Sequence, residues 1–300
     1  MSKIVAWTQW SDLTLPDGVT LHSPKDFPLD TSDLSLINFY VPSYMGGAHA
    51  LSYVAKMPNL KTLQMPNAGY DDALAFVRPD LTLCNASGVH DASTAELAVG
   101  LALSSRRGFP EFIRDQMTQT WDHRRFTSLS DSNIGVIGFG SIGKQVVKNL
   151  SGFDVRVTSF SKSGREGSIK IGELDNYLPT LDIVILILPL TDESRNMFDK
   201  QRLAKMKDGA LIVNVARGPI IDTDALISEL NSGRLHAALD VTDPEPLPVG
   251  HPLWGAKNLL LVPHVGGNST AFEPRARKLV ESQLKLLAEG KPLNNIVAEG

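Results

Sequence analysis

Three ionisable residues of complementary chemistry stand in the second half of the chain. Arg217, Glu245 and His264 each lie shortly after an apolar run that is typical of a buried strand. Arginine binds a carboxylate through two N–H donors, imidazole transfers protons near neutral pH, and a neighbouring carboxylate favours the charged imidazole. Because the carboxyl ends of parallel strands meet at one edge of a sheet, the three side chains are expected in one crevice. They are the groups that reduction of a 2-oxo acid requires.

Each of the three also has a structural interpretation. His264 alone could be a structural histidine, and Glu245 stands between prolines and could belong to a surface loop. Arg217 could pair with Asp222. The shared position of all three after strands of one sheet, which also carries a glycine motif, favours catalysis.

The glycine motif G-x-G-x-x-G stands between an apolar run at 134–137 and a helical pattern at 144–150. Gly138 permits a tight turn, Gly140 lets the backbone approach a pyrophosphate, and Gly143 lets the helix pack against the strand. The helix N-terminus favours the negative charge of phosphates. A glycine-rich turn that binds nothing is the alternative, but the flanking strand and helix favour a dinucleotide site.

The residues after the next predicted strand bear on the choice of dinucleotide. An acidic residue about twenty positions past the glycines would bind the ribose hydroxyls of NAD. The sequence instead has Ser161, Lys162, Ser163 and Arg165. Hydroxyl and cationic side chains suit a 2′-phosphate, so NADP(H) is favoured over NAD(H). The alternative is a solvated polar loop.

Composition limits the partners and the compartment. The 300 residues carry a formal net charge of −4, which disfavours nucleic acid and anionic membranes as partners. Cys84 is the only cysteine, so an internal disulfide is excluded and a reducing, cytoplasmic location is expected. The apolar run 4–7 is too short for a signal peptide, and the run 183–190 is too short for a membrane span. No metal site is expected.

Strand and helix patterns alternate along the chain and predict an α/β fold with parallel sheets. A long helix beginning near Thr94 and a closing helix from about Ala271 through Leu287 are expected to cross between two domains. The segment 108–131 is less regular and could be a dimer arm or a solvated surface excursion. The first domain is expected to contain strands at 4–7, 36–41, 61–65 and 81–84.

A turn at 66–72, between the last two of these strands, exposes backbone N–H groups at the carboxyl end of a strand. Such a turn can bind an anionic ligand. An ordinary connection is the alternative, and this stretch alone favours that alternative.

Taken together, these motifs resemble those of the D-isomer-specific 2-hydroxyacid dehydrogenase family. The resemblance covers nearly the whole chain, and residues 67–71 look like the family's substrate loop. It rests on five ordered motifs, at 138–143, 188–191, 214–218, 239–241 with 245–247, and 263–267. It implies a smaller flavodoxin-like substrate domain of residues 1–93 and 270–300, and a Rossmann-type NADP-binding domain of residues 94–269.

The resemblance also implies roles for individual residues. Arg217 would hold the substrate carboxylate and polarise the 2-oxo group, and His264 would donate the proton during reduction and accept it during oxidation. Glu245 would raise the pKa of His264. Asp240 would orient the nicotinamide carboxamide, and backbone N–H groups of Ala68 and Gly69 would bind the carboxylate. The other cofactor-binding residues implied are Ser141, Ile142, Leu188, Pro189, Val215 and Gly266.

The sequence therefore predicts an NADP(H)-dependent homodimeric reductase of small 2-oxo acids such as glyoxylate or hydroxypyruvate. Ser161 departs from the family's usual acidic residue, which disfavours NAD. A phosphoglycerate dehydrogenase without its regulatory domain is an alternative, but Lys56 and Arg78 are the only obvious extra cations near the substrate loop. A formate dehydrogenase is disfavoured because that branch lacks the Glu–His pair. A non-catalytic dinucleotide-sensing scaffold, like the C-terminal-binding corepressors, is the alternative of a different class.

Overall fold

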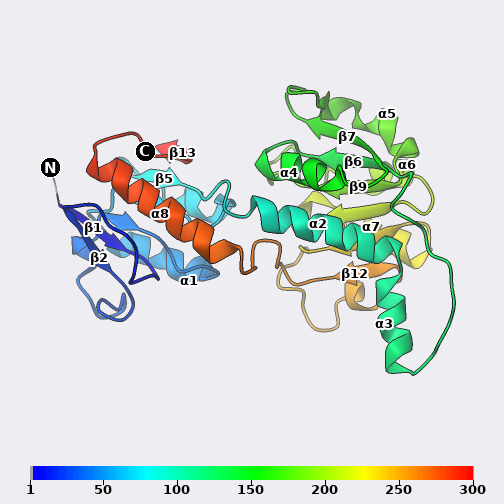
Figure 1. Ribbon diagram of the computed structural model, residues 1–300, viewed down its shortest axis with the longest axis horizontal. Helices are drawn as coiled ribbons and strands as arrows, with labels where there is room; N and C mark the ends of the chain where they lie inside the picture. Colours follow the sequence, from blue (N-terminus) through cyan, green and yellow to red (C-terminus); the bar gives the residue numbers. More distant parts are fainter. Residues whose placement is uncertain (1–2, 300) are drawn as a thin grey trace. The chain divides into compact units, whose positions relative to one another are not determined.

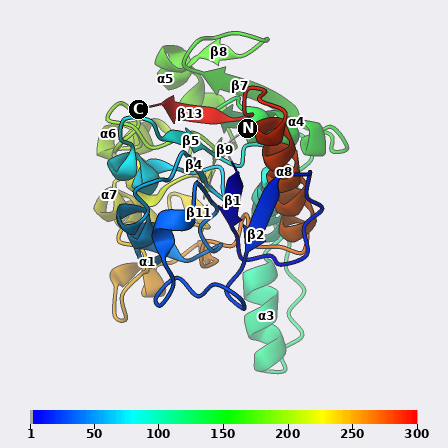
Figure 2. The same ribbon diagram turned by 90° about the vertical axis from the view of Figure 1, so that its left-hand side faces the viewer.

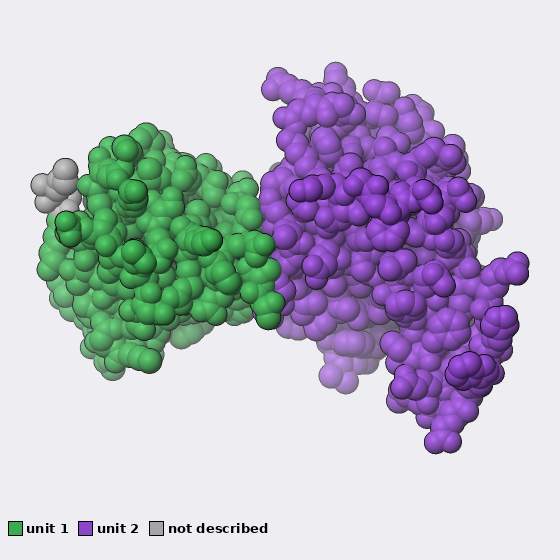
Figure 3. Space-filling model, in the orientation of Figure 1, with its two compact units in different colours: residues 1–90, 270–300 green, residues 91–269 purple. Residues whose placement is uncertain are grey.

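Both ends of the chain build one α/β unit, and the continuous middle builds another (Figure 3). The structure is a computed structural model that describes residues 3–299. Residues 1–90 with 270–300 are called unit 1, and residues 91–269 are called unit 2. Each unit has its own sheet and its own cores, and each is described by itself.

The sheet of unit 1 has the strand order β13-β5-β4-β3-β1-β2, of which Figure 1 labels β13, β5, β1 and β2. Neighbouring strands pair in parallel, except that β13 runs antiparallel to β5. The parallel part has the order 2-1-3-4-5 of flavodoxin-like sheets, as predicted. The strands are β1 (Ile4–Trp7), β2 (Val19–His22), β3 (Phe39–Tyr40), β4 (Thr62–Gln64), β5 (Thr82–Cys84) and β13 (Ile296–Glu299).

Alternate residues of these strands face two helical layers, because side chains of a strand point to opposite faces in turn. Ile4 and Phe39 pack in one cluster with α8 (Phe272–Ala288), which lies along the sheet in Figure 2. Trp7 and Tyr40 pack in the other cluster, with Leu51 of α1 (Gly47–Ser52). Short 3₁₀ helices complete this unit: η1 (Leu34–Leu36), η2 (Tyr53–Lys56) and η3 (Asp71–Phe76).

The strands of unit 1 differ from the prediction in two ways. The strand predicted at 36–41 is confined to Phe39–Tyr40, because Asp33 caps a preceding 3₁₀ helix by accepting the Ser35 N–H. The strands β2 and β13 were not predicted. Both lie at sheet edges and carry no fully buried residue. In β2 apolar and polar residues alternate, and in β13 the apolar run is only three residues long, so the signal of a buried strand is weak in both.

Unit 2 contains a parallel sheet in the order β12-β11-β10-β9-β6-β7-β8, of which Figure 1 labels β12, β9, β6 and β7. If β6 is counted as strand 1 of this unit, the order from β8 to β11 is 3-2-1-4-5-6, which is the Rossmann arrangement. The strand β12 adds one further strand at the edge. All of its strand pairs are parallel. The strands are β6 (Asn133–Ile137), β7 (Arg156–Ser161), β8 (Ile169–Lys170), β9 (Ile183–Leu186), β10 (Leu211–Asn214), β11 (His236–Leu239) and β12 (Leu259–Leu261).

Helices cover both faces of this sheet. One core joins alternate residues of the central strands to α2 and α4, and the other joins the intervening residues to α5, α6 and α7. No helix within residues 3–299 is long and apolar enough to cross a membrane. The helices of unit 2 are α2 (Asp91–Arg106), α3 (Phe109–Met117), α4 (Ser141–Leu150), α5 (Leu174–Tyr177), α6 (Lys200–Lys205), α7 (Thr223–Asn231), η4 (Ile171–Glu173), η5 (Leu178–Thr180), η6 (Gly218–Ile220) and η7 (Pro252–Gly255).

The helix α3 projects from the body of unit 2 (Figures 1 and 2). It follows Gly108, whose φ of 67° lies in the left-handed region that favours glycine. None of its residues is buried. Phe109, Phe112, Ile113 and Met117 recur at helical spacing and are all exposed, so α3 presents an apolar face outward.

Candidate active site

The glycine loop lies where the strand order of unit 2 reverses. It follows β6, whose two neighbours β7 and β9 continue the sheet in opposite directions. In open α/β sheets, ligands bind at such a point, outside the carboxyl ends of the strands. The strands β10, β11 and β12 are parallel to β6, so the residues that follow them belong to the same edge.

The three glycines of the motif are placed differently. Gly138 has a φ of 107°, and a side chain there would overlap the Ile187 carbonyl. A side chain at Gly143 would overlap the Gly138 carbonyl, whereas one at Gly140 would meet only open space. The open side of Gly140 and the N-terminus of α4, which begins at Ser141, are what a pyrophosphate needs. These residues therefore fit a dinucleotide.

Arg217 follows β10 in a segment that is held by a buried asparagine. Asn214, which is 1% exposed, accepts the Ala216 N–H at 3.0 Å and donates to the Arg217 carbonyl at 2.9 Å. The Arg217 guanidinium donates to the Ala216 carbonyl at 2.7 Å. The positioning role of Asn214 was not predicted, although an amide after the apolar residues of a buried strand is a signal for it.

Glu245 and His264 are joined by a short hydrogen bond between Oε1 and Nδ1. Glu245 also accepts the Thr242 N–H at 3.4 Å. His264 has a φ of 50°, a conformation that is uncommon for residues other than glycine and often occurs at functional sites. Since Nδ1 is held by Glu245, Nε2 is the nitrogen that can exchange a proton with a substrate.

The buried carboxylate of Asp240 organises the turn that carries His264. Asp240 is 3% exposed and accepts the N–H groups of Val265 at 2.6 Å and Gly266 at 3.0 Å. Its backbone carbonyl accepts the His264 N–H at 2.7 Å. A side chain at Gly266 would press on the Asp240 carboxylate. The end of β11 therefore fixes the segment that follows β12.

The charges of this cluster influence one another. The hydrogen bond from Glu245 raises the pKa of His264 above its ordinary 6.5, although burial and the Arg217 charge oppose this. Burial raises the pKa of Glu245, but the bond to His264 outweighs burial and leaves it below 4.5. Burial raises the pKa of Asp240 above 3.8, against the N–H groups that it accepts. The pair can thus hold an imidazolium beside a carboxylate.

The loop after β7 carries the residues predicted to choose the dinucleotide. The Ser161 hydroxyl lies 2.7 Å from the Ser168 hydroxyl and accepts the Gly164 N–H at 3.0 Å. Lys162 forms an ion pair with Glu193 at 2.7 Å, and both side chains are largely exposed. The ammonium group therefore already has a carboxylate partner, which the sequence did not reveal because Glu193 follows a different strand. Ser163 is exposed.

The other predicted cofactor residues of unit 2 lie beside these loops. Ile142 is in the first turn of α4, and Val215 is buried directly after β10. Leu188 and Pro189 follow β9, and the Ser194 hydroxyl donates to the Pro189 carbonyl at 2.8 Å.

The predicted substrate loop belongs to unit 1. It follows β4, and its carbonyls are held by amide side chains: Asn85 donates to Ala68 at 2.8 Å and Asn67 donates to Gly69 at 2.9 Å. Within residues 3–299, the N–H groups of Ala68 and Gly69 have no acceptor. They are thus available to an anion.

Known proteins are similar to this chain in sequence and in fold. Residues 99–266 match the family model for the D-isomer specific 2-hydroxyacid dehydrogenase, NAD binding domain. A glyoxylate reductase of Thermofilum pendens is 33% identical over 249 residues, which cover 78% of this chain and 74% of that protein. A D-3-phosphoglycerate dehydrogenase of Methanocaldococcus jannaschii is 31% identical over 81% of this chain, but the match spans 48% of that longer protein.

A solved structure has the same architecture. The D-isomer specific 2-hydroxyacid dehydrogenase from Xanthobacter autotrophicus Py2, in complex with NADPH and MES, superposes with a TM-score of 0.79 at 26% identity. The superposition covers 99% of this chain and 98% of that one. The resemblance predicted from the motifs and the α/β, Rossmann-type fold are confirmed. The chain belongs to the D-isomer specific 2-hydroxyacid dehydrogenase family and carries that family's NAD-binding domain.

Proposed function

We propose that this protein is an NADP(H)-dependent D-2-hydroxyacid dehydrogenase that works mainly as a reductase of small 2-oxo acids, with glyoxylate and hydroxypyruvate as the favoured substrates. The observation that supports this most directly is the hydrogen bond between Glu245 and His264, which holds a proton donor at the sheet edge that also carries the glycine loop. The glyoxylate reductase of Thermofilum pendens supports the substrate class. A cytoplasmic location remains a prediction.

In the proposed reaction, the bound dinucleotide supplies a hydride to the carbonyl carbon of the 2-oxo acid. His264 donates its Nε2 proton to the carbonyl oxygen, which becomes the hydroxyl group. Arg217 binds the carboxylate and polarises the carbonyl. Glu245 stabilises the imidazolium before the proton leaves. Asp240 would help to hold the dinucleotide by accepting a hydrogen bond from its nicotinamide carboxamide. Ala68 and Gly69 remain predicted carboxylate contacts.

A phosphoglycerate dehydrogenase activity is the second candidate, and the archaeal relative of that name favours it. A phosphorylated substrate needs cations near the substrate loop. Arg78 instead donates to the carbonyls of Val54 and Met57, and Lys56 lies over the ring of Tyr53. Arg78 is thus held by two backbone carbonyls beside η2, which favours an unphosphorylated substrate.

The proposed proton donor is tested by His264→Ala. The variant should lose about 10²–10⁴-fold in kcat for NADPH oxidation with glyoxylate or hydroxypyruvate, the usual contribution of a general acid. It should still bind NADPH, as measured by fluorescence titration. His123→Ala, at an exposed histidine, is the control and should keep full activity. Turnover near the wild-type rate in His264→Ala would remove His264 from this role, and no turnover in the wild type would favour the scaffold alternative.

The coupling of Glu245 to His264 is tested by the pH dependence of kcat/KM for the 2-oxo acid. Reduction needs the imidazolium, so activity falls as pH rises through the pKa of His264. Glu245 raises that pKa. The fall should therefore begin at a lower pH in Glu245→Gln than in the wild type. Superimposable alkaline limbs would show that Glu245 and His264 are not coupled.

Cofactor preference is tested by kcat/KM for NADPH and NADH. The exposed ion pair of Lys162 with Glu193 is worth at most about 1 kcal/mol, whereas a charge-assisted bond to a 2′-phosphate is worth about 1.5–3 kcal/mol. Exchange of partners leaves Lys162 a net gain of about 0.5–3 kcal/mol, and Arg165 can add a second charge-assisted contact, so NADPH should be preferred by about tenfold or more.

Two variants test whether Ser161 and Lys162 cause the preference for NADPH. Ser161→Asp should shift the ratio of kcat/KM toward NADH, because the new carboxylate repels the 2′-phosphate. Lys162→Ala should lower kcat/KM for NADPH and leave that for NADH unchanged. Lys148→Ala, at an exposed lysine of α4, is the matched control. A wild-type preference for NADH would contradict the assignment.

We also propose that two copies of the chain pair through the apolar face of α3. Sedimentation equilibrium should give a dimer for the wild type, and Met117→Glu, which changes a residue that is 81% exposed, should weaken it. Leu36→Glu, at a 53% exposed residue of unit 1, should leave the association unchanged. A monomeric wild type would show that residues 108–131 are a solvated excursion.

A further inference from the structure

Unit 2 contains a cavity of about 480 Å³ at the edge of its sheet opposite to the catalytic set. Leu211 and His236, the first residues of β10 and β11, are register partners and form part of its wall. Arg217 and the glycine loop follow the carboxyl ends of strands in this sheet, so the cavity is separate from them. The other lining residues are Ser105, Arg106, Arg125, Phe126, Thr127 and Gly209.

The lining of the cavity is basic. It includes two arginines and a histidine, Arg106, Arg125 and His236, and none of the lining residues is acidic. Arg125 is exposed and forms no ion pair with any residue from 3 to 299. Burial lowers the pKa of His236, the charge of Arg106 lowers it further, and the charge of Glu111 opposes this lowering, so the positive charge of the lining is mainly that of the two arginines.

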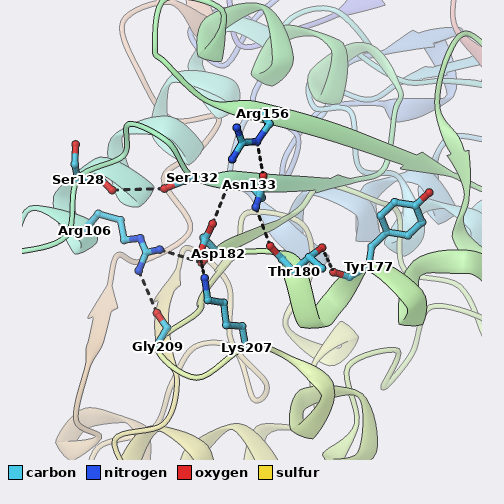
Figure 4. A network of polar contacts seen from close by, with 10 residues as sticks. All are labelled: Arg106, Ser128, Ser132, Asn133, Arg156, Tyr177, Thr180, Asp182, Lys207 and Gly209. Carbon is cyan, nitrogen blue, oxygen red and sulfur yellow. Dashed lines mark hydrogen bonds and ion pairs between the residues drawn. The ribbon is translucent and has the colours of Figure 1, made fainter.

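A network of polar contacts holds Arg106 in place (Figure 4). Its guanidinium donates to the carbonyl of Gly209 at 3.1 Å and to the carbonyl of Asp182 at 3.3 Å. The Asp182 carboxylate is already bound by the Lys207 ammonium at 2.6 Å and the Asn133 N–H at 2.9 Å. Arg106 is therefore oriented mainly by neutral carbonyls, and no carboxylate forms an ion pair with it among the described residues.

We propose that this cavity binds a small organic anion, a carboxylate or a phosphate ester with an apolar body. The two arginines can receive the anionic group, since guanidinium groups form paired hydrogen bonds with carboxylates and phosphates. The ring of Phe126, which is partly exposed, can pack against the apolar body. The volume lies in the range of small-molecule sites. This inference does not depend on the proposed dehydrogenase activity.

Calorimetric titration of the full chain, saturated with NADPH, tests the proposal with phenyl phosphate, benzoate and uncharged benzyl alcohol as probes. At least one anion should bind saturably, one per chain, whereas benzyl alcohol should not. The relative affinities of phenyl phosphate and benzoate identify the favoured anionic group. Arg125→Ala should lower the affinity for the bound anion about tenfold, and Arg125→Lys should restore part of this lost affinity.

Two control variants test whether the anion binds in this cavity. Arg107→Ala removes an exposed arginine next to Arg106 that does not line the cavity, and it should leave the affinity unchanged. Arg217→Gln alters the proposed substrate site and should also leave it unchanged. Absence of saturable binding, equal binding of benzyl alcohol, insensitivity to Arg125→Ala, or an equal loss in Arg107→Ala would overturn the proposal. Loss in Arg217→Gln alone would assign the anion to the substrate site.

Discussion

The candidate active site depends on one buried carboxylate, that of Asp240. Its side chain accepts two N–H groups from the turn after β12, and its carbonyl accepts a third from His264. These bonds fix a histidine in a left-handed backbone conformation beside Glu245. A buried anion is costly unless it is hydrogen-bonded, so Asp240 and the turn stabilise each other. The pairing of β11 with β12 sets the register of the two strands, and the Asp240 side chain extends this connection to the turn that carries His264.

The parts that sequence could predict are those with a strong local signal. Buried parallel strands are runs of apolar residues, and the glycine motif stands at a fixed place between one strand and one helix. Arg217, Glu245 and His264 could be grouped because all follow strands of one sheet. The edge strands β2 and β13 had only a weak signal, because β2 alternates apolar and polar residues and the apolar run of β13 is three residues long.

Contacts between residues distant in sequence could not be predicted. The Lys162 pair with Glu193 joins two loops that follow different strands, and the Asn214 bonds depend on the path of the next segment. The basic cavity likewise joins the end of α2 to the starts of two strands and to the segment after α3. Prediction of each of these contacts requires the strand order of the sheet, which the patterns in a single sequence do not reveal.

The pKa of His264 is the measurement that tests its proposed role as proton donor most directly. The chain has seven histidines, so the NMR signals of the His264 imidazole can be assigned by comparing the wild type with His264→Asn. A pH titration of the wild type should give His264 a pKa above 6.5, because Glu245 holds the charged form. A pKa at or below 6.5 would contradict the pairing and, with it, the proposed role of His264 as the proton donor.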